Sequence, residues 1–104
     1  MEIIIIKSRN KDKKYDAIID GKKTVSFGAK GYSDFTQHKD TERKNRYLSR
    51  HKTHENWRDP KTARFHATNI LWNKPSLTAS VADTKKRFPK LDIKLRVGYV
   101  INIF

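Results

Sequence analysis

The sequence predicts an α+β domain, in which a small, mainly antiparallel sheet from the N- and C-terminal segments has two or three short helices packed on one face. Residues 1–30 and 91–104 contain stretches in which apolar and polar side chains alternate, as in half-buried strands, whereas residues 40–88 repeat apolar side chains at helical spacing. The pattern changes within residues 20–40, which hold three of the four glycines. A chain of 104 residues is long enough for one hydrophobic core, so we expect a single domain over residues 1–104.

The N-terminal segment predicts a three-stranded meander. Residues 3–6 are four consecutive isoleucines, which we expect to form a strand buried on both faces or, unless it is paired, an aggregation-prone edge strand. Residues 13–20 alternate in the manner of a second strand and end on Asp20-Gly21. This dipeptide predicts a tight hairpin turn, because both central residues of a type I′ turn need positive φ. Residues 25–29 then form the third strand.

The first predicted helix begins at Asp40, whose carboxylate can accept hydrogen bonds from backbone N–H groups of the first turn, and runs to about residue 54. Tyr47 and Leu48 are the two large apolar residues in this length, and basic side chains occupy most of the remaining surface. The exposed face of this helix is therefore the first candidate for contact with a polyanion.

Two further helices are predicted from their caps. Asp59-Pro60 combines an N-cap with proline at the first helical position and so begins the second helix, which ends at Lys74-Pro75. The third helix is capped by Asn73 or Ser76 and ends before Pro89. The expected apolar stripes are Ala63, Ala67, Ile70 and Leu71 on the second helix and Leu77, Val81, Thr84 and Phe88 on the third.

The C-terminal segment predicts strands that join the N-terminal sheet. Leu91, Ile93, Leu95 and Val97 alternate with polar residues in a clear amphipathic pattern. The tail from Tyr99 to Phe104 is apolar, and such a tail is costly to leave in water. We expect it to pair with the sheet or to mediate self-association with a neighbouring subunit.

Composition excludes several classes of protein. The chain has no cysteine, which excludes disulfides and thiolate metal sites. Its longest apolar run is far shorter than the roughly 20 residues that span a bilayer, so no membrane span is expected. The start also lacks the features of a signal peptide.

Charge is the strongest signal in the composition. Twenty-four Lys and Arg residues stand against eleven Asp and Glu residues, which gives a net charge of +13. The excess is spread along the chain with a bias to residues 61–104, which carry nine basic and two acidic residues. A field of this size attracts polyanions such as DNA, RNA or an acidic protein surface. The candidate contact residues are Lys30, Arg43, Lys44, Arg46, Arg50, Lys52, Lys85, Lys86 and Arg87.

Two shorter features could also contact a nucleic acid. Residues 28–31, with Lys30, could hold a phosphate through backbone N–H groups, but the interpretation we prefer is an ordinary exit from the third strand. Tyr32 and Phe35 lie among basic residues, a mixture that single-strand binders use to stack on bases. The alternative is that they fold back over the sheet, and Trp57 and Trp72 are expected in the core.

A metal site is the sharpest catalytic hypothesis. His51, His54 and Glu55 superficially fit a ligand set of a metal-dependent nuclease, and Asp34, His38, Asp40 and Asp59 are further candidates. However, the spacing lacks the His-Glu-x-x-His pattern that places a base beside zinc. We expect ordinary histidines, no bound metal, no cofactor and no catalytic residues.

Six short sequence motifs between residues 14 and 88 are distinctive when taken together. They are DGKKTVSFGAKGYSDFTQHKD (20–40), RKNRYLSRH (43–51), ENW (55–57), TA (62–63), ILWNKPSLTASVAD (70–83) and KRF (86–88). In these motifs the chain resembles a family of small basic proteins encoded by large DNA viruses of eukaryotes and by some phages. That family has no established activity, so the resemblance implies a viral origin and little about mechanism.

Charge and resemblance together predict a non-enzymatic viral structural protein. We expect a minor capsid or internal virion component that contacts nucleic acid, acidic viral proteins or capsid proteins, located in the virion and in the interior of the host cell, in cytoplasm or nucleus. The alternative is a soluble nucleic-acid-binding protein of viral replication or transcription, and a metal-dependent nuclease is the third hypothesis. Steep loss of binding with salt would indicate contacts dominated by phosphate.

Overall fold

The computed structural model describes residues 1–51 and 57–97 and contains a four-stranded mixed sheet in the order β3-β2-β1-β4. The strands are β1 (Glu2–Lys7), β2 (Lys13–Ile19), β3 (Lys23–Ala29) and β4 (Asp92–Leu95). The pairs β1–β2 and β2–β3 are antiparallel, and β4 lies parallel to β1. The predicted α+β class, with a mainly antiparallel sheet from both ends of the chain, is confirmed.

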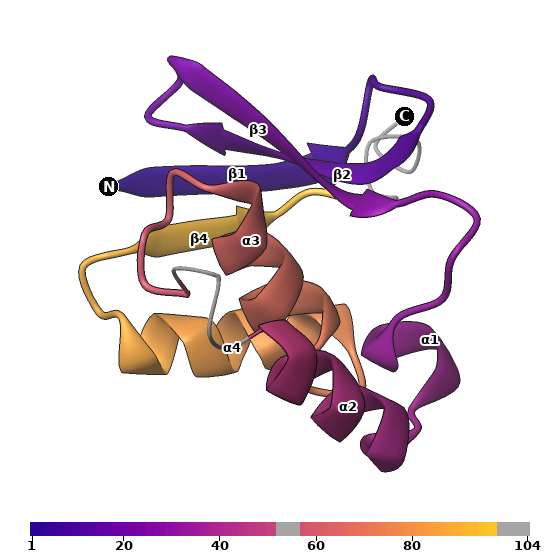
Figure 1. The fold of residues 1–104 in the computed structure, drawn as a ribbon. Helices are drawn as coiled ribbons and strands as arrows, with labels where there is room; N and C mark the ends of the chain where they lie inside the picture. The colour runs from indigo at the N-terminus through magenta and orange to yellow at the C-terminus, as the bar shows by residue number, and fades with distance from the viewer. Residues whose placement is uncertain (52–56, 98–104) are drawn as a thin grey trace, which may run out of the picture.

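The helices all lie on the same side of the sheet (Figure 1). They are α1 (Phe35–His38), α2 (Thr41–His51), α3 (Ala63–His66), the π-helical turn η1 (Ala67–Leu71) that continues α3, and α4 (Leu77–Arg87). The segment α3–η1 packs against β3, and α4 packs against η1 and β4, while α2 contacts α1. In the part of the chain described here, no helix combines the length and the apolar composition that crossing a membrane requires.

The turn between β2 and β3 has the predicted geometry. Asp20 and Gly21 have φ values of 51° and 68°, and the Lys22 N–H donates to the Ile19 carbonyl at 3.0 Å. The Asp20 side chain has a second role, since its Oδ1 accepts a hydrogen bond from the Glu2 N–H at 2.8 Å. The turn is thereby tied to the start of β1.

The isoleucine strand β1 is buried on one face only, which corrects the prediction that both faces are buried. Ile3 and Ile5 are fully buried against the helices, whereas Ile4 and Ile6 are only partly buried. The reason is the one-sided arrangement of the helices, which leaves the outer face of the sheet uncovered by any helix of the described chain. Since β1 lies between β2 and β4, the backbone of this apolar strand is paired on both sides.

A single apolar cluster joins the sheet to the helices. Its buried members are Ile3, Ile5, Ala17, Ile19, Val25, Phe27, Phe65, Ile70, Leu71, Val81, Leu91 and Ile93. Trp72, Leu77 and Phe88 are partly buried and pack against this cluster. Trp72 therefore lies at the edge of the core in which it was expected. Every strand contributes to this cluster, and so do α3, η1 and α4.

The second helix begins later than predicted. Its N-cap is Thr62, whose Oγ1 accepts a hydrogen bond from the Phe65 N–H, while Asp59 closes the preceding turn by accepting from the Lys61 N–H at 3.0 Å. With this start, Phe65 is fully buried and Ala63 is exposed. The expected apolar stripe was therefore wrong at Ala63, and it omitted Phe65.

The other predicted caps and the last strand are confirmed. Asp40 Oδ1 accepts hydrogen bonds from the backbone N–H groups of Glu42 and Arg43, and Ser76 caps α4 by accepting from the Ala79 N–H. The strand β4 follows the expected alternation. The predictions for Lys52 and for the tail from Tyr99 to Phe104 lie outside the described residues.

Candidate nucleic-acid-binding cleft

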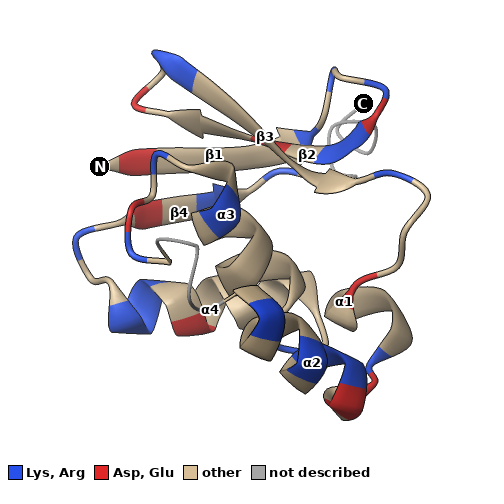
Figure 2. Cartoon of the chain, in the orientation of Figure 1, with Lys and Arg blue, Asp and Glu red and all other residues tan. Residues whose placement is uncertain are grey.

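Two carboxylates are buried in the fold, whereas no Lys or Arg side chain among the described residues is fully buried. These carboxylates belong to Asp16 and Asp34, which are each only 3% exposed. Lys and Arg residues lie on α2, near the C-terminal end of α4 and on the loops of the sheet (Figure 2). The exposed positive charge is therefore distributed over several elements.

Asp16 shows how a carboxylate is satisfied inside the molecule. It lies on β2, and it accepts hydrogen bonds from the hydroxyls of Ser8 and Ser26 and from the Arg9 N–H. Burial raises the pKa of this carboxyl, but the three hydrogen bonds outweigh burial and hold the pKa below its ordinary value. The charge of Asp16 thus stays inside the protein and does little to offset the basic surface.

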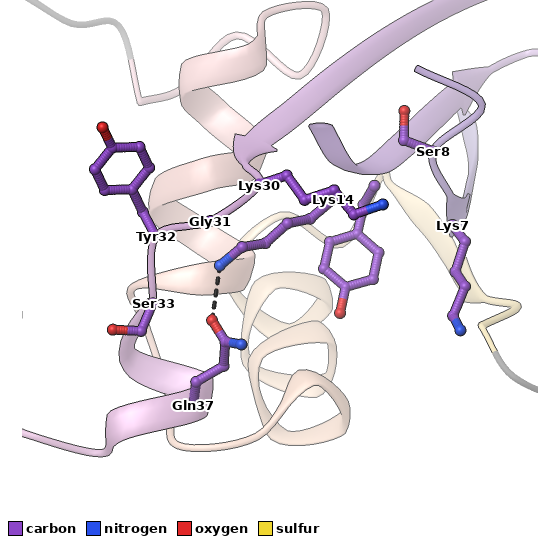
Figure 3. Close-up of a pocket in the computed structure, with 9 residues that line it drawn as sticks. Lys7, Ser8, Lys14, Lys30, Gly31, Tyr32, Ser33 and Gln37 are labelled. Atoms are coloured by element: carbon purple, nitrogen blue, oxygen red, sulfur yellow. Dashed lines mark hydrogen bonds between the residues drawn. The ribbon is translucent and has the colours of Figure 1, made fainter. Parts of the chain in front are cut away.

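A cleft of about 550 Å³ opens at the end of the sheet where β3 leads into α1. In Figure 3 the segment from Lys30 to Ser33 lies along one side, Lys7 and Ser8 lie on the other, and Lys14 reaches across toward Gln37. Lys7, Ser8, Lys14, Tyr15, Lys30, Gly31, Tyr32, Ser33 and Gln37 line the cleft. Of the predicted contact residues, the structure brings Lys30 and Tyr32 together here.

Glycines shape the wall that carries Lys30. Gly28 has a φ of 80°, and a Cβ at this position would lie 2.8 Å from Leu71 Cδ1, so glycine is favoured here by conformation and by space. Gly31 has a φ of 93°, which turns the chain after β3. The Lys30 N–H donates to the Asp12 carbonyl at 3.0 Å and ties this wall to the β1–β2 loop.

An ion pair fixes the far side of the cleft. Lys14 Nζ lies 2.6 Å from Asp34 Oδ2 and 2.7 Å from Gln37 Oε1, and both members of the ion pair are largely buried. Asp34 also caps α1 in a capping box with Gln37. The charge of Lys14 is therefore compensated, and its main role is to hold α1 against β2.

Lys7 and Lys30 supply the uncompensated charge of the cleft. Both side chains are exposed, and neither ammonium group has a carboxylate partner within residues 1–51 and 57–97. Tyr15, which also lines the cleft, has a raised pKa because of burial and the nearby Asp34 carboxylate, so its hydroxyl is protonated at neutral pH. Two ammonium groups and one phenol suit a phosphate, which accepts charge-assisted hydrogen bonds.

The two stacking candidates have different environments. Tyr32 is 75% exposed, and Figure 3 shows its ring projecting from the rim of the cleft. Phe35 is only 7% exposed and carries Lys44 Nζ over its ring at 5.0 Å from the centroid. Only Tyr32 of this pair presents a ring to a ligand, and the stacking role expected for Phe35 is corrected to a core role.

The basic residues of α2 divide into exposed and structural ones. Arg43, Arg46 and Arg50 are exposed, and Arg46 makes only a long contact of 3.9 Å with Glu42. Lys44 is half-buried and its Nζ donates to the Asn73 carbonyl at 2.6 Å, and burial lowers its pKa. Lys44 therefore fastens α2 to the segment before α4, a structural role that the sequence did not indicate.

The basic residues at the C-terminal end of α4 also comprise exposed and structural ones. Lys85 and Lys86 are exposed, whereas Arg87 donates from Nε to Asp83 Oδ2 at 2.8 Å and from Nη2 to Asn69 Oδ1 at 2.7 Å. Arg87 thus joins α4 to η1 and is a structural residue. In Figure 2 this end of α4 lies at the opposite end of the molecule from α1, so it is a separate surface from the cleft.

Histidines and carboxylates do not converge on an ion within residues 1–51 and 57–97, where no group of three or more such side chains has a metal-binding arrangement. His54 and Glu55, two members of the hypothetical ligand set, lie outside this part of the chain. His66 is fully buried, with Nε2 at 2.7 Å from the Pro60 carbonyl, and burial lowers its pKa to about 4. It is a neutral core residue.

Sequence reasoning missed six residues of the cleft, namely Lys7, Ser8, Lys14, Tyr15, Ser33 and Gln37. Gln37 had a readable signal, because Asp34-x-x-Gln37 matches a capping box. Lys7 and Lys14 face the cleft only because two antiparallel strands bring them together, since Lys7 pairs with Tyr15. Such an arrangement depends on strand register, which local patterns in the sequence do not reveal.

One family model matches the chain, over residues 3–51, and it is described as a family of unknown function (DUF5754). The matched segment runs from β1 to the end of α2 and contains every residue that lines the cleft. No curated protein and no solved structure matches the chain.

Proposed function

We propose that this protein is a non-enzymatic component of a viral particle, a minor capsid or internal virion protein, and that its basic surface binds nucleic acid. The observation that carries the proposal is the large number of exposed lysines and arginines, two of which line the cleft without a carboxylate partner within residues 1–51 and 57–97. Most Lys and Arg side chains of the described residues are exposed, while Asp16 and Asp34 are buried among hydrogen-bond donors. A surface of this kind attracts phosphates of any sequence.

The exposed lysines and arginines bind nucleic acid by neutralising its phosphates, and one cleft provides a defined contact. Exposed lysines and arginines on α2, on α4 and around the sheet provide general attraction. The cleft adds Lys7 and Lys30 on opposite sides of a hollow of about 550 Å³. This volume is within the range of ordinary ligand sites and leaves room for a phosphate with its sugar.

The salt dependence of binding tests the nucleic-acid part of the proposal. The protein is titrated into a fluorescently labelled duplex at salt concentrations from about 50 to about 200 mM, and the logarithm of the binding constant should fall linearly with the logarithm of salt. Replacing Lys7 and Lys30 together by alanine should reduce the slope by about 1 for each phosphate that these two lysines neutralise in the wild-type complex.

The matched control is the double variant Lys22→Ala/Lys23→Ala, which removes two exposed lysines at the β2–β3 hairpin, the far end of both strands from the cleft. It should change the slope less than the cleft variant does. Equal effects of the two variants would show that the cleft has no special role, and binding that is insensitive to salt would contradict phosphate contact. Cleavage of the nucleic acid that depends on added divalent metal would contradict the non-enzymatic role.

Placement in the particle draws its support from the resemblance to viral proteins and has a separate test. Purified particles are washed with increasing salt, and the washed particles and the released fraction are compared by mass spectrometry. The protein should be found in particles and should leave with nucleic acid or with its protein partners. Its absence from unwashed particles would overturn the virion placement and favour a role in replication or transcription.

A further inference from the structure

A second hollow adjoins the cleft on the side away from Lys7. It has a volume of about 270 Å³ and shares Lys14, Tyr32 and Ser33 with the first cleft. Its remaining lining is mostly apolar or aromatic and comprises Gly28, Ala29, Asp34, Tyr47, Ala67, Leu71 and Trp72. Cationic and aromatic linings therefore meet at Tyr32 and Ser33.

The back of this second hollow is a fixed aromatic surface. The rings of Tyr47 and Trp72 are stacked, with centroids 4.2 Å apart and planes at 3°. Trp72 also packs against the hydrophobic core, and its ring centroid lies 5.3 Å from that of His38. Because both rings already have ring partners, they can line a hollow without rearrangement.

Tyr32 is unlike the other aromatic residues of the described chain. At 75% exposed it is one of two large apolar side chains there that lie open to solvent, and the other is Met1 at the N-terminus. The chain around it is fixed, since the Tyr32 N–H donates to the Ala29 carbonyl at 3.4 Å and the Lys30 N–H donates to the Asp12 carbonyl. An exposed aromatic ring on a fixed backbone beside uncompensated lysines is the arrangement that single-strand binders use.

We propose that the two hollows together bind single-stranded nucleic acid in preference to a duplex. Lys7 and Lys30 hold a phosphate in the first cleft, and Tyr32 stacks on the adjacent base at the rim, with the aromatic second hollow beside it. In a duplex the bases are paired and stacked on each other, so Tyr32 has no base face to contact and only the phosphate contacts remain. This inference rests on the proposed function and specifies the strand form that the site takes.

The test compares wild-type protein with Tyr32→Leu and Tyr32→Phe, each titrated into labelled oligothymidine and into a duplex of equal length at one salt concentration. Tyr32→Leu removes the ring and should weaken single-strand binding by about 5- to 150-fold, the range measured for stacking on one base. Tyr32→Phe keeps the ring and should bind nearly as wild type does. Neither change should alter duplex affinity by more than about twofold.

The controls distinguish a failure of the stacking site from a failure of the proposed nucleic-acid binding. Because Tyr32 is exposed, both variants should keep the wild-type melting temperature, which circular dichroism verifies. If Tyr32→Leu leaves single-strand binding unchanged, or weakens single-strand and duplex binding equally, the stacking site is overturned while the proposed function stands. If wild-type protein binds neither strand form in a salt-dependent way, the proposed function fails as well. Equally tight binding of polyglutamate would show attraction to any polyanion and would also overturn the site.

Discussion

At the scale of single residues, a few buried polar groups determine which charges reach the surface. Asp34 accepts from Lys14, from Thr36 and from its own capping turn, so one carboxylate holds α1, β2 and the cleft wall together. Lys44 and Arg87 are likewise used inside the molecule. In the sequence all basic residues look alike, whereas the structure distinguishes those that stabilise the fold from those that can bind a partner.

His66 makes the stability of the fold depend on pH. Its pKa is about 4 in the folded protein, lowered by burial, and about 6.5 in an unfolded chain, so between these values only the unfolded state binds the proton. Stability from this residue is complete above pH 6.5 and is lost as the pH falls toward 4. We expect acidification from pH 7 to pH 4 to reduce the free energy of unfolding by roughly 3 kcal/mol, measured by urea denaturation.

The variant His66→Gln serves as the control, because glutamine does not titrate. It should be less stable than wild type at pH 7, since the Pro60 contact and the packing against Phe27 change, but its stability should vary little between pH 7 and pH 5. Asp16 titrates below its ordinary pKa and so acts at lower pH. A pH dependence that remains in His66→Gln would assign the effect to other groups.

At the scale of elements, the end of β3 packs closely against η1 at Gly28. Replacing Gly28 by alanine should destabilise the protein for two reasons. Its φ of 80° is strained for any L-residue, and the new Cβ would lie 2.8 Å from Leu71 Cδ1, within the buried π-helical turn η1. We expect a loss of about 2–4 kcal/mol in the free energy of unfolding, as strain and overpacking add.

Gly21→Ala is the matched control for this prediction. Gly21 also has a positive φ, 68°, but nothing lies within 4 Å of a Cβ at that position. The free energy of unfolding should fall by about 1 kcal/mol, which is the conformational cost alone. Equal losses in urea denaturation of Gly21→Ala and Gly28→Ala would show that Leu71 moves aside without cost, and the close packing of β3 against η1 would then have no energetic role.

The elements that the sequence predicts best are those that depend on local chemistry. The Asp20-Gly21 turn and the caps at Asp40 and Ser76 each involve contacts within a few residues, and they are where the sequence places them. The start of the second helix is different, because Asp59 and Thr62 are both good caps and only the burial of Phe65 selects Thr62. The parallel pairing of β4 with β1 is likewise determined by residues far apart in the chain.

At the scale of the whole molecule, the fold has two layers, a sheet and the helices that cover one of its faces. Positive charge is displayed on several of its surfaces. The general conclusion, a compact α+β scaffold with a basic surface, follows from pattern and composition. The cleft could be predicted only in part, through Lys30 and Tyr32, because its other cationic members come from β1 and from the start of β2 and meet through strand pairing. The sequence left Phe35 open between stacking and folding back over the sheet, since an aromatic residue beside lysines has the same local pattern whether it is buried or exposed.

The most direct test of nucleic-acid binding at the cleft is a map of backbone amide shifts when isotope-labelled protein is titrated with oligothymidine. We expect the largest shifts at Lys7, Ser8 and residues 30–33, with smaller, salt-sensitive shifts at the exposed arginines of α2. Shifts confined to the C-terminal end of α4, or no shifts with oligothymidine in excess at low salt, would contradict it.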